Sequence, residues 1–213
     1  MKLSRLGICG IISLLSYTAM VIFSPLAYPG YAWLSMAVSD LSAVGAPSAT
    51  LASQLNALFA PCGIVSIMAV CVATQNVTEK PLRFGVYSFC SMEWICNVGY
   101  EMFPWVLDAG SASFQNVMHL LVTVLVVILS LVSLVLVAVG TRKGKYKSLS
   151  NWAFCCLAMM LLGAIGSGVM PRTVFGLFER FSIFSTVIFN AVLGVYLLSG
   201  KFENKNPENA DIR

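Results

Sequence analysis

The chain has 213 residues, of which 58% are hydrophobic and 10% charged, and its formal net charge is +4. Soluble domains carry about 25% charged residues and disordered chains are more polar still, so the composition excludes both classes. It predicts an all-α, polytopic membrane protein. Because one spanning helix needs about 20 apolar residues, the length allows about six or seven helices joined by short loops.

Six apolar segments are long enough to cross a bilayer as helices. They cover about residues 6–24, 55–74, 84–103, 114–140, 152–170 and 174–199. We therefore expect a bundle of six transmembrane helices over residues 1–200, followed by a polar cytoplasmic tail over residues 201–213.

The first segment follows Lys2 and Arg5, and a basic start before an apolar stretch is also typical of a signal peptide. However, Ser24-Pro25-Leu26-Ala27 is a poor cleavage site for a signal peptidase. Cleavage would also leave an odd number of spanning segments. We therefore expect an uncleaved first helix.

Positive charge is concentrated on one side of this topology. If the N-terminus is cytoplasmic, 11 of the 13 Lys and Arg residues lie in cytoplasmic segments, and only Arg172 and Arg180 lie outside. The eleven are Lys2, Arg5, Lys80, Arg83, Arg142, Lys143, Lys145, Lys147, Lys201, Lys205 and Arg213. This bias satisfies the positive-inside rule, so we expect a protein of the bacterial inner membrane with both termini in the cytoplasm. The charges indicate topology and contact with membrane lipids, and they do not indicate nucleic-acid binding.

The longest predicted connection is the outer loop over residues 25–53, which contains no Lys or Arg. Its Tyr28, Tyr31 and Trp33 are aromatic residues of the kind found where lipid meets water. Residues 32–44 are apolar enough to form a short helix at that boundary. A loop of this length is usually functional or disordered, and its apolar content argues against disorder.

Eight ionisable residues fall in the outer half of the predicted bundle. They are Asp40, Glu93, Glu101, Asp108, His119, Arg172, Glu179 and Arg180. Glu93 lies near the bilayer midplane, where an ionised carboxylate costs about 2.5–3.5 kcal/mol even on a lenient scale. Glu93, Asn97 and Glu101 recur at four-residue spacing and share one helix face. We therefore expect an outward-facing polar pocket that binds or transports a small polar or amphiphilic, lipid-like ligand. Its predicted lining residues are Asp40, Glu93, Asn97, Glu101, Asp108, His119, Glu179 and Arg180.

The same residues leave other functions open. An intramembrane enzyme acting on a lipid or a peptide is one alternative, with His119 and either Asp40 or Glu101 as its acid and base. A structural or assembly subunit with an unknown protein partner is another. Arg180 either binds an anionic ligand or pairs internally with Glu101 or Asp108. A catalytic zinc site often has several histidines and this chain has one, so we expect no metal and no cofactor.

Several short motifs occur in a fixed order relative to the six segments. They are Ser39-Asp40-Leu41, Gly45-Ala46-Pro47, Asn56, Phe103-Pro104 with Asp108, His119 and Gly176-Leu177-Phe178-Glu179-Arg180. Over about residues 5–200 the chain thereby resembles an uncharacterised prokaryotic family of six-helix membrane proteins, domain of unknown function 998. The resemblance implies six spanning helices and marks Asp40, Asp108, His119, Glu179 and Arg180 as motif positions, and it implies no particular activity. Glu101-Met102-Phe103-Pro104 departs from the glycine that the family usually has before this Phe-Pro pair.

Overall fold

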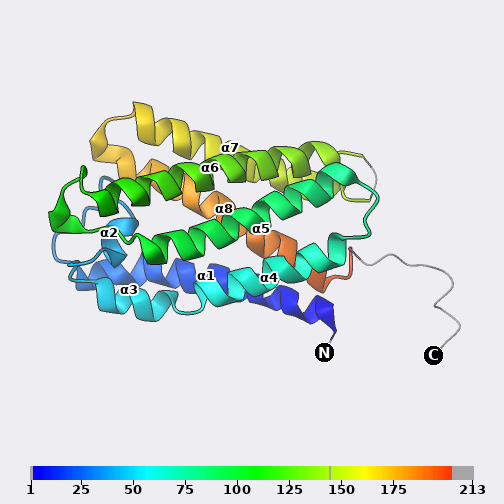
Figure 1. Ribbon diagram of the computed structural model, residues 1–213, viewed down its shortest axis with the longest axis horizontal. Coiled ribbons are helices and arrows are strands. Elements are labelled where there is room, and N and C mark those ends of the chain that lie inside the picture. The colour runs from blue at the N-terminus through cyan, green and yellow to red at the C-terminus, as the bar shows by residue number, and fades with distance from the viewer. Residues whose placement is uncertain (1, 144, 203–213) are drawn as a thin grey trace, which may run out of the picture.

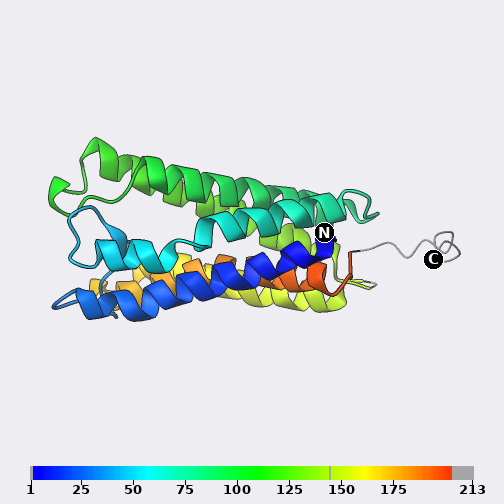
Figure 2. The same cartoon turned by 90° about the horizontal axis from the view of Figure 1, so that it is seen from below.

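The computed structural model describes residues 2–143 and 145–202. Within these ranges six long helices lie side by side in one bundle (Figures 1 and 2). They are α1 (Ile8–Phe23), α4 (Phe59–Thr74), α5 (Lys80–Met102), α6 (Phe114–Gly140), α7 (Lys147–Val169) and α8 (Phe175–Leu198). The shorter α-helices are α2 (Ser39–Ser42) and α3 (Ala49–Asn56), and 3-10 turns cover Leu3–Gly7, Ser24–Ala27, Leu107–Ala109 and Arg172–Val174. The predicted all-α fold is confirmed, whereas most of the predicted tail lies outside the described residues.

The long helices alternate in direction, so the connections divide between two ends of the bundle (Figure 1). The N-terminus, the turns after α4 and α6 and the end of α8 share one end, which we call the basic end. The described basic residues there are Lys2, Arg5, Lys80, Arg83, Arg142, Lys143, Lys145, Lys147 and Lys201. The opposite end, the loop end, holds the connections over 24–58, 103–113 and 170–174. Arg172 and Arg180 lie toward the loop end, so basic residues are divided between the two ends as the sequence predicts.

Five helical stretches are long and apolar enough to cross a bilayer. They are Leu3–Ala27, Ala49–Thr74, Phe114–Gly140, Lys147–Val169 and Arg172–Leu198. Helix α5, which contains the predicted third span, has 23 residues and is therefore about 34 Å long at 1.5 Å per residue. It packs between α4 and α6 but carries Glu93, Asn97 and Glu101, which make it less apolar than the other five. Five of the six predicted spans thus correspond to these apolar stretches, and the sixth corresponds to α5, a less apolar helix in the same bundle.

The outer faces of the bundle are apolar. On α6 the exposed large side chains are Phe114, Val117, Leu120, Leu121, Val124, Leu125, Ile128, Val132, Val135 and Val139. Soluble monomers rarely expose an apolar surface of this extent, and helices that are apolar on all sides are typical of membrane spans. The chain is therefore a multi-pass helical membrane protein.

Helix α8 lies at the centre of the bundle, where α1, α4 and α7 pack against it. The most apolar stretch of Arg172–Leu198 is 56% buried, against 28% for that of Phe114–Gly140. Two glycines of α7 allow close contact: a Cβ atom on Gly163 would lie 2.3 Å from the backbone nitrogen of Ser182, and one on Gly166 would overlap the ring of Phe178. Gly163 and Gly166 therefore serve the packing of α7 against α8, whereas a Cβ atom on Gly168 would meet no described atom within 4 Å.

The first loop contains less helix than residues 32–44 allow by composition. Only α2, four residues long, is α-helical in this stretch. The carbonyl oxygens of Trp33 and Met36 accept hydrogen bonds from Arg180 of α8, which competes with their use inside a continuous helix. The loop therefore folds onto the start of α8 instead of forming one amphipathic helix.

Candidate functional site

Arg180 is the most heavily hydrogen-bonded charged side chain at the loop end, and it is only 4% exposed. Its Nη1 donates to the carbonyl oxygens of Trp33 at 2.9 Å, Met36 at 3.2 Å and Gly176 at 2.7 Å. Its Nη2 donates to the hydroxyl of Tyr31 at 2.6 Å. The guanidinium also lies 4.6 Å from the centroid of the Trp33 ring, a cation–π contact. Arg180 thus holds the first loop against α8.

Two of the three acidic motif residues at this end, Glu179 and Asp40, also bind backbone. Glu179 accepts a hydrogen bond from the Val38 amide, with 2.6 Å between oxygen and nitrogen. Asp40 accepts one from the Ala37 amide at 2.9 Å, and Tyr31 donates to the Ala37 carbonyl at 2.7 Å. Burial raises the pKa of Asp40 above its ordinary 3.8 and that of Tyr31 to about 12. We call this group, Tyr31, Asp40, Glu179 and Arg180, the loop lock.

The internal ion pair considered for Arg180 is not formed. Glu101 and Asp108 are both exposed, and the guanidinium donates to carbonyl and hydroxyl oxygens instead. The carbonyl oxygens of Trp33, Met36 and Gly176 already surround Nη1 of Arg180. A carboxylate could reach this nitrogen only by displacing the first loop. The loop lock therefore joins α8 to the first loop and does not join α8 to α5.

His119 stands apart from the loop lock, in an aromatic environment. Its Nδ1 lies 2.9 Å from the carbonyl oxygen of Phe103, so a proton on Nδ1 is the arrangement that this acceptor favours. Its ring packs against Tyr100, with centroids 4.7 Å apart, and against Trp105 at 5.6 Å. Asp40 bonds to Ala37 and does not pair with His119. This geometry assembles no acid–base pair from the two.

Asn116, which the sequence analysis does not single out, holds the second loop in place. It is fully buried; its Oδ1 accepts from the Val106 amide, and its Nδ2 donates to the carbonyls of Val106 and Gly110, each at 2.9 Å. The Val44 amide in turn donates to the Trp105 carbonyl at 2.8 Å. The two outer loops are therefore tied to each other and to α6.

A second polar group lies inside the bundle, at the contact of α1, α4, α5 and α8. Glu93 and Asn190 are 4% and 2% exposed, and Asn190 Nδ2 donates to Glu93 Oε1 at 2.9 Å and to the Gly63 carbonyl at 3.2 Å. Asn97 Nδ2 lies 3.3 Å from Glu93 Oε2. A Cβ atom on Gly63 would lie 3.1 Å from Ser13 Oγ and 3.6 Å from Glu93 Oε2. We call these five residues, Ser13, Gly63, Glu93, Asn97 and Asn190, the interior site.

The interior site contains more hydrogen-bond acceptors than donors. Two acceptors face Asn190 Nδ2, which fixes the orientation of this amide. Its Oδ1 is buried and has no partner within the described residues, and the same holds for the hydroxyl of Ser66 on α4. Buried polar atoms normally have partners, and each exception requires an explanation. At 1.5 Å per residue Glu93 lies about 14 Å along α5 from Met102, so these atoms are far from either end.

The structure thus divides the predicted pocket residues among four places. Asp40, Glu179 and Arg180 form the loop lock with Tyr31; Glu93 and Asn97 belong to the interior site; His119 packs among aromatic rings; Glu101 and Asp108 are exposed. Asn116 and Asn190 were not predicted, because the predicted pocket was built from ionisable residues and from Asn97, which shares a helix face with Glu93. An asparagine inside an apolar helix is itself a signal, since membrane helices rarely bury amides without partners. No three His, Cys, Asp or Glu side chains gather as a metal site in the ranges that the structure describes.

The chain belongs to the DUF998 family of proteins of unknown function, whose model matches residues 11–196. This match confirms the resemblance that the ordered motifs indicate. Comparison with curated proteins and with solved structures found no match.

Proposed function

We propose that this protein is a multi-pass component of the bacterial inner membrane that binds a small polar ligand at the interior site, as a carrier or a receptor. Both termini lie in the cytoplasm in this proposal, because the basic end holds nine of the described Lys and Arg residues. The loop end then faces the periplasm. The observation that supports the ligand most directly is the buried Glu93 carboxyl beside Asn190, whose Oδ1 has no donor in residues 2–143 and 145–202.

The hydrogen-bond balance favours a particular class of ligand. Each oxygen of Glu93 faces one amide donor and keeps further acceptor capacity. Asn190 Oδ1 accepts no hydrogen bond from the part of the chain that the structure describes. The site therefore needs hydrogen-bond donors or positive charge. A small monovalent cation or a primary ammonium compound meets this need, whereas an anion would meet only acceptors.

The hydrogen bonds of Arg180 in the loop lock argue against its binding an anionic ligand. Both of its Nη atoms already donate to oxygen atoms of the protein. Its Nε, which has no acceptor among the described residues, is buried, so an anionic headgroup would have to displace the first loop to reach the guanidinium. His119 has no carboxylate partner among its contacts, which gives the intramembrane enzyme less support than binding.

Access to the interior site is proposed from the loop end. Along α5 the polar residues continue from the buried Glu93 through the half-buried Asn97 to the exposed Glu101, which marks one direction as more polar. At the same end of the bundle, the hydrogen bond from the Val38 amide to Glu179 holds the first loop against α8. In this proposal, release of the first loop from α8 is the motion by which a ligand would enter.

Thermal stability of the purified protein in detergent tests the proposal. Unfolding is followed in sodium, potassium and methylammonium chloride, with bulky N-methylglucamine chloride as the reference at equal ionic strength. A cation at about ten times its Kd contributes about 1.4 kcal/mol and raises Tm by about 3–6 °C. We expect at least one small cation to do so in the wild type, and Glu93→Gln to remove the gain.

Glu101→Gln is the matched control, because it removes a carboxylate from the same helix at an exposed position. It should keep the cation-dependent gain in Tm. Equal Tm values in all four salts for the wild type, or an undiminished gain in Glu93→Gln, would show that the interior site does not bind cations.

A further inference from the structure

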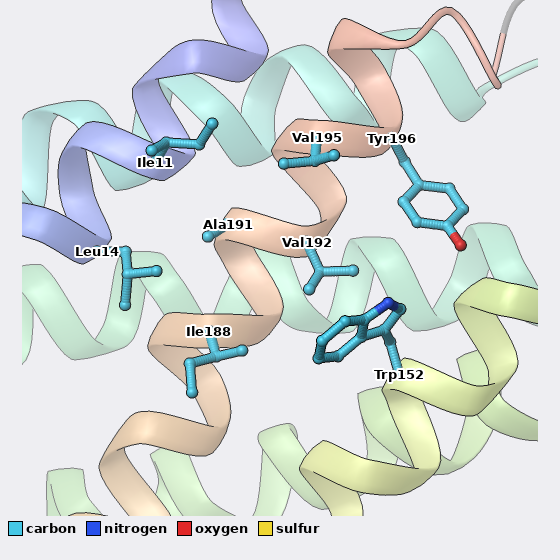
Figure 3. Close-up of a pocket in the computed structure, with 8 residues that line it drawn as sticks. All are labelled: Ile11, Leu14, Trp152, Ile188, Ala191, Val192, Val195 and Tyr196. Atoms are coloured by element: carbon cyan, nitrogen blue, oxygen red, sulfur yellow. The ribbon is translucent and has the colours of Figure 1, made fainter.

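An apolar groove runs along the outer face of α8 between α1 and α7, and it does not involve the interior site. Its volume is about 300 Å³. Figure 3 shows the side chains that line it: Ile11 and Leu14 from α1, Trp152 from α7, and Ile188, Ala191, Val192, Val195 and Tyr196 from α8. Val195 and Trp152 are 46% and 48% exposed, so the groove opens onto the surface that faces lipid.

The groove has a polar and positively charged end. The Tyr196 hydroxyl is hydrogen-bonded to the hydroxyl of Ser148 on α7. Lys201, just beyond α8, places its Nζ 4.4 Å from the centroid of the Tyr196 ring. Lys147 precedes Ser148 and is exposed. A ligand in the groove would therefore meet hydrocarbon along its length and ammonium groups at the basic end.

We infer that this groove binds one acyl chain of an anionic phospholipid, whose phosphate lies beside Lys201. From Ile188 to Tyr196 the groove is about 12 Å long at 1.5 Å per residue, which fits within one leaflet of a hydrocarbon core about 30 Å thick. Tyr196 and Trp152 are residues that membrane proteins place near the headgroups. The positive charge complements a phosphodiester, so the occupant is a lipid of the leaflet that contacts the basic end.

Retention of lipid through purification tests this inference. The protein is reconstituted in vesicles of equal parts phosphatidylglycerol and phosphatidylcholine, extracted and repurified in detergent, and its bound lipids are quantified by mass spectrometry. One basic contact near anionic lipid is worth about 1 kcal/mol, which corresponds to about fivefold in affinity. We expect phosphatidylglycerol to be enriched about fivefold over phosphatidylcholine on the wild-type protein.

Two pairs of variants separate the headgroup from the acyl chain. Lys201→Ala should abolish the enrichment, whereas Lys143→Ala, at an exposed site in the turn after α6, should keep it. Val195→Trp fills the groove and should reduce the retained amount of both lipids. Val135→Trp adds the same ring to an exposed face of α6 and should not.

Three results would overturn the inference. Equal retention of the two lipids by the wild type would mean that the groove holds unselected boundary lipid. Unchanged enrichment in Lys201→Ala would place the phosphate elsewhere. A wild-type dimer that Val195→Trp converts to a monomer would identify the occupant as a second copy of the chain.

Discussion

Asp40 is a polar residue whose ionisation is set by its half-buried position in the first loop. Burial raises its pKa above 3.8, while the hydrogen bond from Ala37 and the charge of Arg180 oppose that shift without cancelling it. Glu179 and Tyr31 lie in the same loop lock, and Glu179 is hydrogen-bonded to Val38. The folded protein therefore binds the Asp40 proton more tightly than the unfolded chain does.

This shift predicts how stability depends on pH. A raised folded-state pKa gives a contribution that is fully present below the unfolded pKa, near 3.8, and is lost as pH rises through the folded value. Asp40→Asn removes the titration but keeps an oxygen that can accept from Ala37. As pH rises from about 4 through the raised pKa of Asp40, Tm of the wild type should therefore decrease relative to that of Asp40→Asn.

Tm measured across this range for both proteins checks the prediction. Asp108→Asn is the control, because Asp108 is an exposed carboxylate in the other outer loop and its variant should follow the wild type. A difference between wild type and Asp40→Asn that is constant with pH, or that grows in the opposite direction, would contradict the argument.

At the scale of elements, the sequence predicts the long helices well and their mutual contacts poorly. Apolar runs mark each span because lipid requires them. The exact start of a helix is predicted less well: α5 begins at Lys80, earlier than the predicted residue 84. A long basic side chain such as that of Lys80 can reach the membrane boundary from a helix end. The contact of the first loop with α8 has no such local signal: Val38 and Glu179 are 141 residues apart. Asp40, Glu179 and Arg180 were recognisable as motif residues, but their binding to backbone was not.

The loop lock gives the prediction at this scale. Arg180→Lys keeps the charge but loses the planar fork that serves the Trp33 and Met36 carbonyls and the Tyr31 hydroxyl together. A buried polar group left without its partner costs about 1–3 kcal/mol, so Tm should decrease by about 2–12 °C.

Arg172→Lys is the matched control for Arg180→Lys. Arg172 is exposed and lies over the ring of Phe175, 4.9 Å from its centroid, so its replacement should change stability by less than about 0.5 kcal/mol. Equal Tm values for the two variants would mean that the first loop is held by something other than Arg180.

At the scale of the whole molecule, charge and polarity have separate positions. The basic residues gather at one end and the groove opens near it, whereas the loop lock closes the other end and the interior site lies between them. Orientation in the membrane connects these features. If the basic end lies in the cytoplasm, as proposed, the groove faces the inner leaflet and the proposed ligand would reach the interior site from the periplasm.

Accessibility of introduced cysteines to a membrane-impermeant maleimide tests this orientation. Ser111, in the second outer loop, and Lys143, in the turn after α6, are both exposed and lie at opposite ends of the bundle. In spheroplasts, Ser111→Cys should be labelled at once and Lys143→Cys only after the membrane is permeabilised, because the positive-inside rule keeps the basic turn in the cytoplasm. The parent protein, with its seven free thiols, sets the background. Labelling in the reverse order would invert the bundle, move the groove to the outer leaflet and give the interior site a cytoplasmic entrance.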